Sequence, residues 1–103
     1  MANRLKTNPI YIDQFNADVT LSTPGNPLVI SKVVVLSATD GDIFRLEDTA
    51  GNRILHMVNL GAADTITEDF DGWRCMDGVV IDVSDCTGMD ATNGTDAVWI
   101  YLK

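Results

Sequence analysis

Short apolar runs separated by turn residues recur along the whole chain, and this pattern constrains the fold more than any other feature. The run LVISKVVVLSA at 28–38 is the richest in β-branched residues, which favour strands. No window of a dozen residues carries an apolar stripe at helical spacing without Gly, Asn or Thr interrupting it. The pattern therefore predicts an all-β chain.

Eight segments are predicted as strands: residues 17–22, 28–38, 43–47, 53–60, 65–69, 73–76, 78–84 and 97–103. The third and fourth flank the segment DTAGN, in which Asp opens a turn and Gly accepts positive φ, so they are predicted to form a β-hairpin. Short connections favour antiparallel pairing, and two packed sheets would bury the apolar faces. The predicted fold is a single antiparallel β-sandwich, jelly-roll-like, of about eight strands.

The first sixteen residues differ from the rest, because they combine a proline, three asparagines and two of the seven basic residues with several apolar side chains. We predict an extended N-terminal arm over residues 1–16 and a β-sandwich domain over residues 17–103, since a chain of 103 residues makes one domain. Such an arm either packs along its own sheet or reaches a neighbouring subunit.

Seven basic residues face fifteen acidic ones, for a net charge of −8. This balance argues against a nucleic-acid partner, because binding to phosphates needs clustered Lys and Arg. No apolar run approaches the ~20 residues of a membrane span, and the N-terminus lacks the apolar segment of a signal peptide. We therefore expect no membrane partner and synthesis in a cytosol.

No sequence motif frames a catalytic residue, and we predict neither an enzyme nor a cofactor. His56, the only histidine, lies in the strand-like segment RILHMVNL and is interpreted as a core or rim residue, with a Cys–His dyad as the alternative. Cys75 and Cys86 are interpreted as reduced, packed thiols, and a disulfide between them stays open.

Loop carboxylates offer the best case for a metal, because calcium prefers several such ligands. The candidate groups are Asp40 with Asp42, Glu68 with Asp69 and Asp71, and Asp85 with Asp90. We expect these to be structural turn residues, with a calcium site as the alternative. Glu47 and Asp82 are interpreted as solvent-facing residues of their strands.

The last strand places Val98, Ile100 and Leu102 on one face and Trp99 with Tyr101 on the other. An outward aromatic pair is typical of a contact surface, whereas a strand buried on both faces is the alternative. Trp73 is interpreted as a core or loop anchor. The predicted interface residues combine this pair with the arm: Arg4, Lys6, Ile10, Tyr11, Trp99 and Tyr101.

Three stretches, MANRLKTNPIYID, VISKVVVLSATDGDIFRLEDTAGNRIL and AVWIYLK, resemble segments of small virion proteins from tailed bacteriophages, including auxiliary head proteins that decorate or cement a capsid. The resemblance implies a non-enzymatic β-sandwich or jelly-roll module, often a homotrimer. It also implies a major capsid protein or other virion protein as partner, and a place in the virion after assembly in the host cytoplasm. No site residue is implied by it.

Two other functions stay open. One is a carbohydrate- or receptor-binding β-module of a phage fibre or tail, in which Trp73, Trp99 and Tyr101 stack against sugars. The other is a small enzyme.

Overall fold

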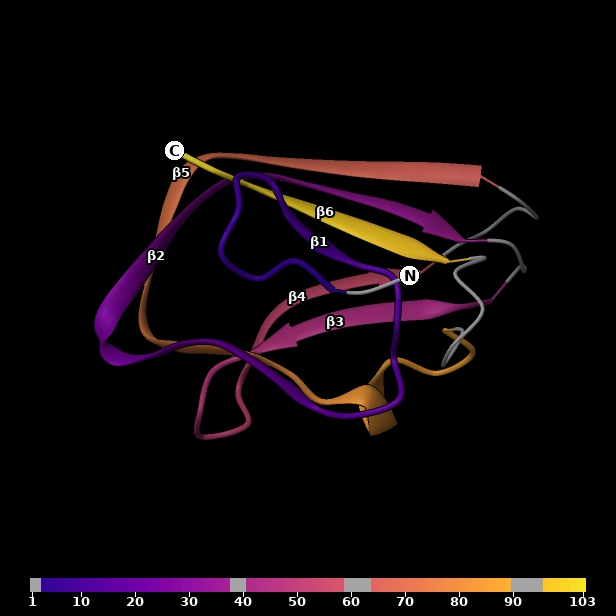
Figure 1. Ribbon diagram of the computed structural model, residues 1–103, viewed down its shortest axis with the longest axis horizontal. Coiled ribbons are helices and arrows are strands. Elements are labelled where there is room, and N and C mark those ends of the chain that lie inside the picture. The colour runs from indigo at the N-terminus through magenta and orange to yellow at the C-terminus, as the bar shows by residue number, and fades with distance from the viewer. Residues whose placement is uncertain (1–2, 38–40, 59–63, 90–95) are drawn as a thin grey trace.

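The computed structural model describes residues 3–37, 41–58, 64–89 and 96–103, and its regular structure is almost entirely β. Six strands form one antiparallel sheet in the order β1–β6–β2–β5–β3–β4 (Figure 1). The elements are β1 (Ile10–Ile12), β2 (Val19–Ser37), β3 (Ile43–Glu47), β4 (Arg53–Val58), β5 (Asp64–Ile81), the 3₁₀ turn η1 (Val83–Asp85) and β6 (Ala97–Leu102). The described part contains no helix that is long and apolar enough to cross a membrane.

Two long strands, β2 and β5, dominate the sheet and pair along their whole length, from Val19 opposite Ile81 to Ser37 opposite Asp64. Midway, β2 advances four residues, from Pro24 to Leu28, while β5 advances only from Asp77 to Cys75. Extra residues in one strand of a pair bend it. Both strands accordingly turn at the left of Figure 1 and run back along its lower side, so that the sheet folds over itself.

Gly78 makes this bend possible. Its φ is +84°, a conformation that other residues adopt only with strain. A Cβ atom at this position would lie 2.7 Å from Cγ2 of Thr49 and 2.9 Å from the carbonyl oxygen of Ser22. Only glycine therefore fits between the bent strands and the β3–β4 loop.

The prediction of about eight strands is wrong, because β2 joins two of the predicted strands and β5 joins three. The turn-like segment 23–27 and the segment around Gly72 were expected to end strands, yet each lies inside one, β2 and β5 respectively. The two segments belong to strands that pair with each other, so hydrogen bonding continues across the irregularity. The all-β class and the antiparallel pairing are confirmed, but the strands belong to one sheet.

The predicted hairpin is confirmed as β3 and β4. Asp48 closes its turn: the carbonyl oxygen accepts from the Gly51 N–H at 3.1 Å, and Oδ1 accepts from the Ala50 and Asn52 N–H groups at 2.9 Å each. The hydrogen bonds from Asn52 lower the pKa of Asp48, because they favour the ionised carboxylate.

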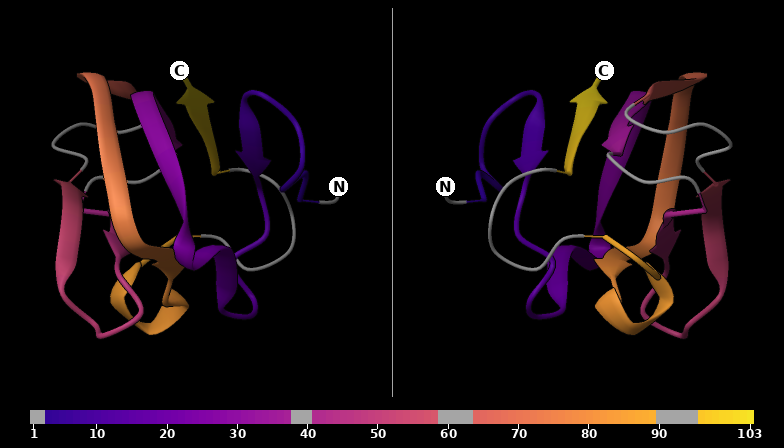
Figure 2. Two further views of the ribbon diagram at one scale, coloured as in Figure 1. Left: turned by 90° about the vertical axis from the view of Figure 1, so that its left-hand side faces the viewer. Right: turned by 90° about the vertical axis from the view of Figure 1, so that its right-hand side faces the viewer.

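One apolar core lies inside the folded-over sheet, and residues from both halves of the bent sheet contribute to it. Its fully buried members come from all parts of the chain: Ile10, Ile12, Ile30, Val33, Phe44, Leu46, Val79, Ile81, Val98 and Ile100. Phe15 packs edge-on against Phe44, with ring centroids 6.3 Å apart. The second half of the predicted arm is therefore part of this core, and β1 packs along β6 (Figure 2).

Candidate functional site

An aromatic face lies outside the core on β1, β6 and β2. Tyr11 of β1 is opposite Trp99 of β6, and their ring centroids are 5.5 Å apart at an interplanar angle of 52°. Next along β6, Tyr101 is opposite Lys32 of β2, whose Nζ lies 4.6 Å from the centre of the tyrosine ring. We call these four side chains the outer face.

Strand alternation places them there. Val98 and Ile100 are completely buried, so their neighbours Trp99 and Tyr101 point to the opposite side of the sheet. Both aromatic residues are half-buried, because the neighbouring strands supply Tyr11 and Lys32 as flanking contacts. The cation of Lys32 over the ring of Tyr101 is a favourable pairing of charge with the aromatic quadrupole.

The segment 3–9, which we call the arm loop, is fastened beside this face. Arg4 and Tyr11 exchange two backbone hydrogen bonds of 2.7 and 2.9 Å. The Asn8 side chain accepts from the Leu102 N–H at 2.9 Å and donates to the Leu102 carbonyl at 3.2 Å. These contacts hold the loop against both β1 and β6.

A groove of about 350 Å³ results between the arm loop and the aromatic rings. We call it the arm groove, and its lining is Arg4, Thr7, Asn8, Pro9, Tyr11 and Trp99. The Tyr11 hydroxyl donates to Oδ2 of the buried Asp13 at 3.2 Å. Burial, and then the charge of Asp13, raise the pKa of Tyr11.

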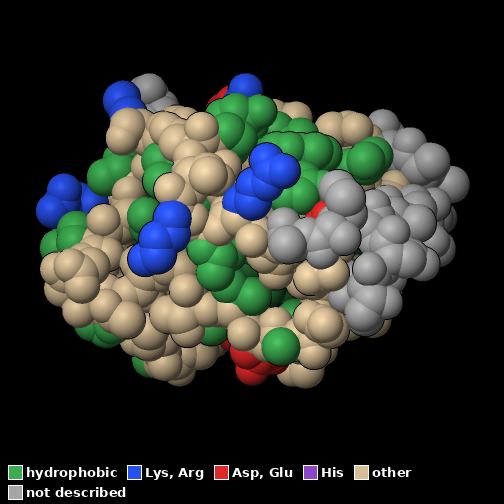
Figure 3. Space-filling view, viewed as in Figure 1, with side chains coloured by type: hydrophobic (Ala, Val, Ile, Leu, Met, Phe, Trp, Pro, Cys, Tyr) green, Lys and Arg blue, Asp and Glu red, His purple; other side chains and the backbone are tan. Residues whose placement is uncertain are grey.

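Basic side chains gather around this region although the chain is acidic. Figure 3 views the molecule from the side of β1 and β6, where Lys and Arg side chains lie among hydrophobic ones and few Asp or Glu are visible. Basic side chains on one face of a chain of net charge −8 favour contact of that face with negatively charged groups.

The predicted interface residues fall into three groups. Arg4, Tyr11 and Trp99 meet in the arm groove, and Tyr101 follows on the outer face. Lys6 is exposed in the arm loop. Ile10 is only 1% exposed and packs in the core opposite Ile100, because its strand neighbour Tyr11 takes the outward position.

The sequence patterns did not predict that Lys32 and Asn8 belong to this surface. The outward position of Lys32 could have been predicted from strand alternation, because its neighbour Val33 is buried. Nothing in the sequence indicates that Asn8 binds the backbone of a residue 94 positions away.

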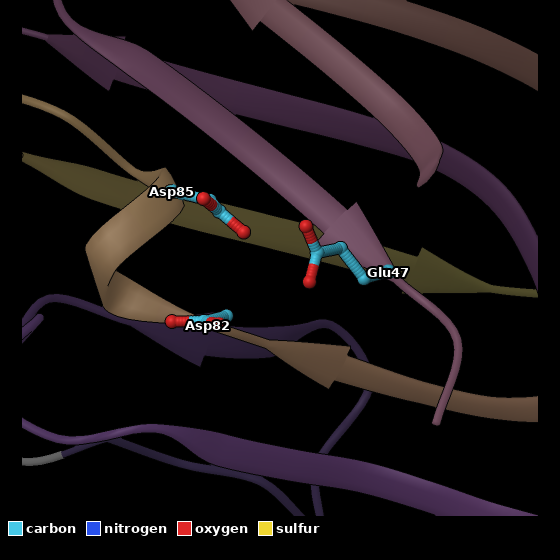
Figure 4. A group of neighbouring side chains, drawn as sticks. All are labelled: Glu47, Asp82 and Asp85. Atoms are coloured by element: carbon cyan, nitrogen blue, oxygen red, sulfur yellow. The ribbon is translucent and has the colours of Figure 1, made fainter. Parts of the chain in front are cut away.

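A second cluster consists of Glu47, Asp82 and Asp85, each of which places a carboxylate oxygen within 4.8 Å of the others (Figure 4). Glu47 ends β3 and points toward η1, while Asp82 is the N-cap of that turn and Asp85 is its last residue. The interpretation of Glu47 as solvent-facing is wrong: the residue is 5% exposed, and its Oε2 lies 2.7 Å from Nε of Arg45.

The pKa values of Glu47 and Asp82 in this cluster are shifted in opposite directions. Burial, and then a hydrogen bond with Asp85, raise the pKa of Glu47. Hydrogen bonds from the hydroxyl and the N–H of Ser84, at 2.7 and 3.1 Å, lower the pKa of Asp82. Glu47 and Asp85 are joined by a side-chain hydrogen bond, and the burial of Glu47 leaves little surface for a substrate. The evident contribution of the cluster is to hold η1 against β3.

The other candidate carboxylates do not assemble into such a group among the described residues. Asp42 is buried and accepts from the Ser37 hydroxyl at 2.7 Å, whereas Glu68 and Asp69 are exposed on β5. Asp40, Asp90 and the side chain of Asp71 lie outside the described part of the structure.

The single histidine faces outward. His56 is exposed on β4, because Leu55 and Met57 take the buried positions on either side of it, so its interpretation as a core or rim residue is wrong. Within the described residues, no hydrogen bond connects it to a serine or a cysteine.

Cys75 and Cys86 are free and buried, in agreement with the prediction of packed thiols. Burial raises the pKa of Cys75, and it raises that of Cys86 to about 11. Neither is therefore an activated nucleophile at neutral pH.

No protein-family model matches this chain, and neither a curated protein nor a solved structure shows significant similarity to it.

Proposed function

We propose that this protein is a non-enzymatic structural component of a tailed-phage virion that binds and stabilises the capsid. Its partner would be the major capsid protein or another virion protein, after assembly in the host cytoplasm. The observation that carries the proposal is the meeting of Arg4, Tyr11 and Trp99 beside Tyr101 on one outward surface. Arginine, tyrosine and tryptophan are the residues that most often dominate the energy of protein interfaces.

Homo-oligomerisation, with a trimer favoured, belongs to the same proposal. One arm groove of about 350 Å³ is small for holding a domain on a lattice. Several copies joined together would multiply weak contacts through effective concentration. In this proposal, the two halves of the bent sheet correspond to the two layers of the jelly-roll-like sandwich that the sequence predicts.

The test uses particles of the phage that encodes this chain, stripped of the protein, and purified protein added back. We expect wild type to co-sediment with the particles and Trp99→Ala to lose most of its binding. Trp73→Ala is the matched control, because Trp73 belongs to β5 and does not line the arm groove. Circular dichroism checks folding, and light scattering reports the oligomeric state.

Failure of wild type to co-sediment would refute the virion role. Equal binding by the two tryptophan variants would place the interface away from the outer face.

Trp73 itself favours a second candidate function, carbohydrate binding. It is 39% exposed, contrary to its interpretation as a core or loop anchor, and its ring lies 5.1 Å from that of Phe70. A supported, exposed indole is the platform on which sugars stack. Binding to a glycan array that Trp73→Ala abolishes would favour this candidate.

A further inference from the structure

We propose that the arm groove binds an acidic segment of a partner protein, with an Asp or Glu carboxylate on the Arg4 guanidinium and an adjacent apolar side chain against Trp99. The inference concerns the surface named in the proposed function and specifies the chemistry of its partner. It can be tested without a virion.

Arg4 is available for such a contact. Its side chain is exposed, and it forms no ion pair within the part of the chain that the structure describes. Guanidinium groups bind carboxylates through two parallel hydrogen bonds, which gives this pairing direction as well as energy. Lys6, exposed in the same arm loop, adds a second positive charge.

Among the described residues, Asp13 contacts the groove lining through Tyr11, and this contact explains why its carboxylate does not pair with Arg4. Asp13 is completely buried, and its Oδ2 accepts the hydrogen bond from the Tyr11 hydroxyl. It thereby fixes the tyrosine ring that packs against Trp99.

The groove is also preorganised. The Arg4 backbone is paired with Tyr11, and Asn8 is bonded twice to Leu102, so the lining needs little ordering when a ligand enters. Reduced ordering cost raises affinity without additional contacts. The rings of Tyr11 and Trp99 and the ring of Pro9 provide the apolar surface.

Shape and topology favour a short segment over a folded domain or an added strand. A volume of about 350 Å³ is at the lower end of ligand sites, which run from ~300 to ~1,000 Å³. The outer edge of β1 is occupied at Tyr11 by Arg4, and the Asn3 side chain accepts from the N–H groups of Asp13 and Gln14. A partner strand therefore cannot pair there, so side chains must provide the recognition.

The probe is a short acetylated peptide in which glutamate alternates with alanine, and glutamine replaces glutamate in the control peptide. Binding is followed in the intact protein by ¹⁵N–¹H NMR at the two indole N–H signals. We expect the glutamate peptide to shift the Trp99 signal and leave the Trp73 signal in place. We also expect binding to weaken as salt is added.

Arg4→Gln should weaken binding about tenfold, as the loss of one charged contact does. Folding should persist, because Arg4 pairs with Tyr11 through backbone atoms. Arg53→Gln is the matched control: it makes the same charge change at an exposed position on β4 and should change affinity less than twofold.

Equal binding of the glutamine peptide, or equal losses in the two arginine variants, would overturn the inference. So would a Trp99 signal that responds only to protein concentration, which would identify a second copy as the occupant, or only to sugars. Particle binding that depends on Trp99 while the peptide fails would refute this inference and leave the proposed function standing. Peptide binding without particle binding would do the reverse.

Discussion

Ile12→Ala tests whether the N-terminal segment is part of the core. Ile12 is completely buried and lies on β1 opposite Val98. The substitution removes three carbon atoms, worth about 0.8 kcal/mol each, and the cavity left behind brings the expected cost to about 3 kcal/mol. For a chain of 103 residues the unfolding entropy is about 0.2 kcal/mol per degree, so Tm should fall by about 14 °C.

Leu5→Ala is the matched control, because it also removes three carbon atoms from the same segment. Leu5 is 37% exposed in the arm loop, so its Tm should change by no more than about 3 °C. Thermal unfolding followed by circular dichroism measures both variants. Similar small shifts for the two would refute the assignment of β1 to the core. Deleting residues 1–12 should also destabilise the fold, because this segment includes the buried Ile10 and Ile12.

Glu47→Gln should become more stable relative to wild type as the pH rises from about 4 to about 7. A carboxyl group whose pKa is raised in the folded state stabilises the fold most below its unfolded pKa, and this contribution is lost as the pH rises. Urea midpoints of both proteins at the two pH values measure this, and parallel pH profiles would contradict it. Gly78→Ala should cost at least about 2 kcal/mol more than Gly25→Ala, because both positions have positive φ but only the first has atoms within 3 Å of the added Cβ; equal urea midpoints would show that the site at Gly78 is roomier than described. Cys86, with its pKa raised to about 11, should resist iodoacetamide at pH 8 in the folded protein and react in urea, and equally rapid labelling in both states would count against its burial.

Sequence patterns predicted those parts of the fold that depend on nearest neighbours. The Asp48 turn and the alternation of Val98, Trp99 and Ile100 follow from turn chemistry and from the two-residue period of a strand. The continuity of β2 through Pro24 and Gly25 does not, because it depends on hydrogen bonds to β5, some fifty residues away in the chain.

The candidate site divides in the same way. Arg4, Tyr11 and Trp99 were recognisable by residue type, but Asn8 joins the groove through contacts with Leu102 at the other end of the chain. Glu47 alternates as an outward strand residue would, yet η1 returns to cover it. A prediction from local sequence pattern cannot include burial by a distant segment of the chain.

The pairing of β1 with β6 has a consequence for how the protein folds. These strands join residues about ninety positions apart, and β6 is the last strand of the chain. The entropy cost of closing so long a loop comes before the stabilising contacts between these strands can form. We therefore expect folding in milliseconds to seconds rather than microseconds. Val98 and Ile100 of β6 are completely buried and lie opposite residues of both β1 and β2. Because β6 pairs with both β1 and β2, we expect these strands to gain their stability together, as one cooperative unit.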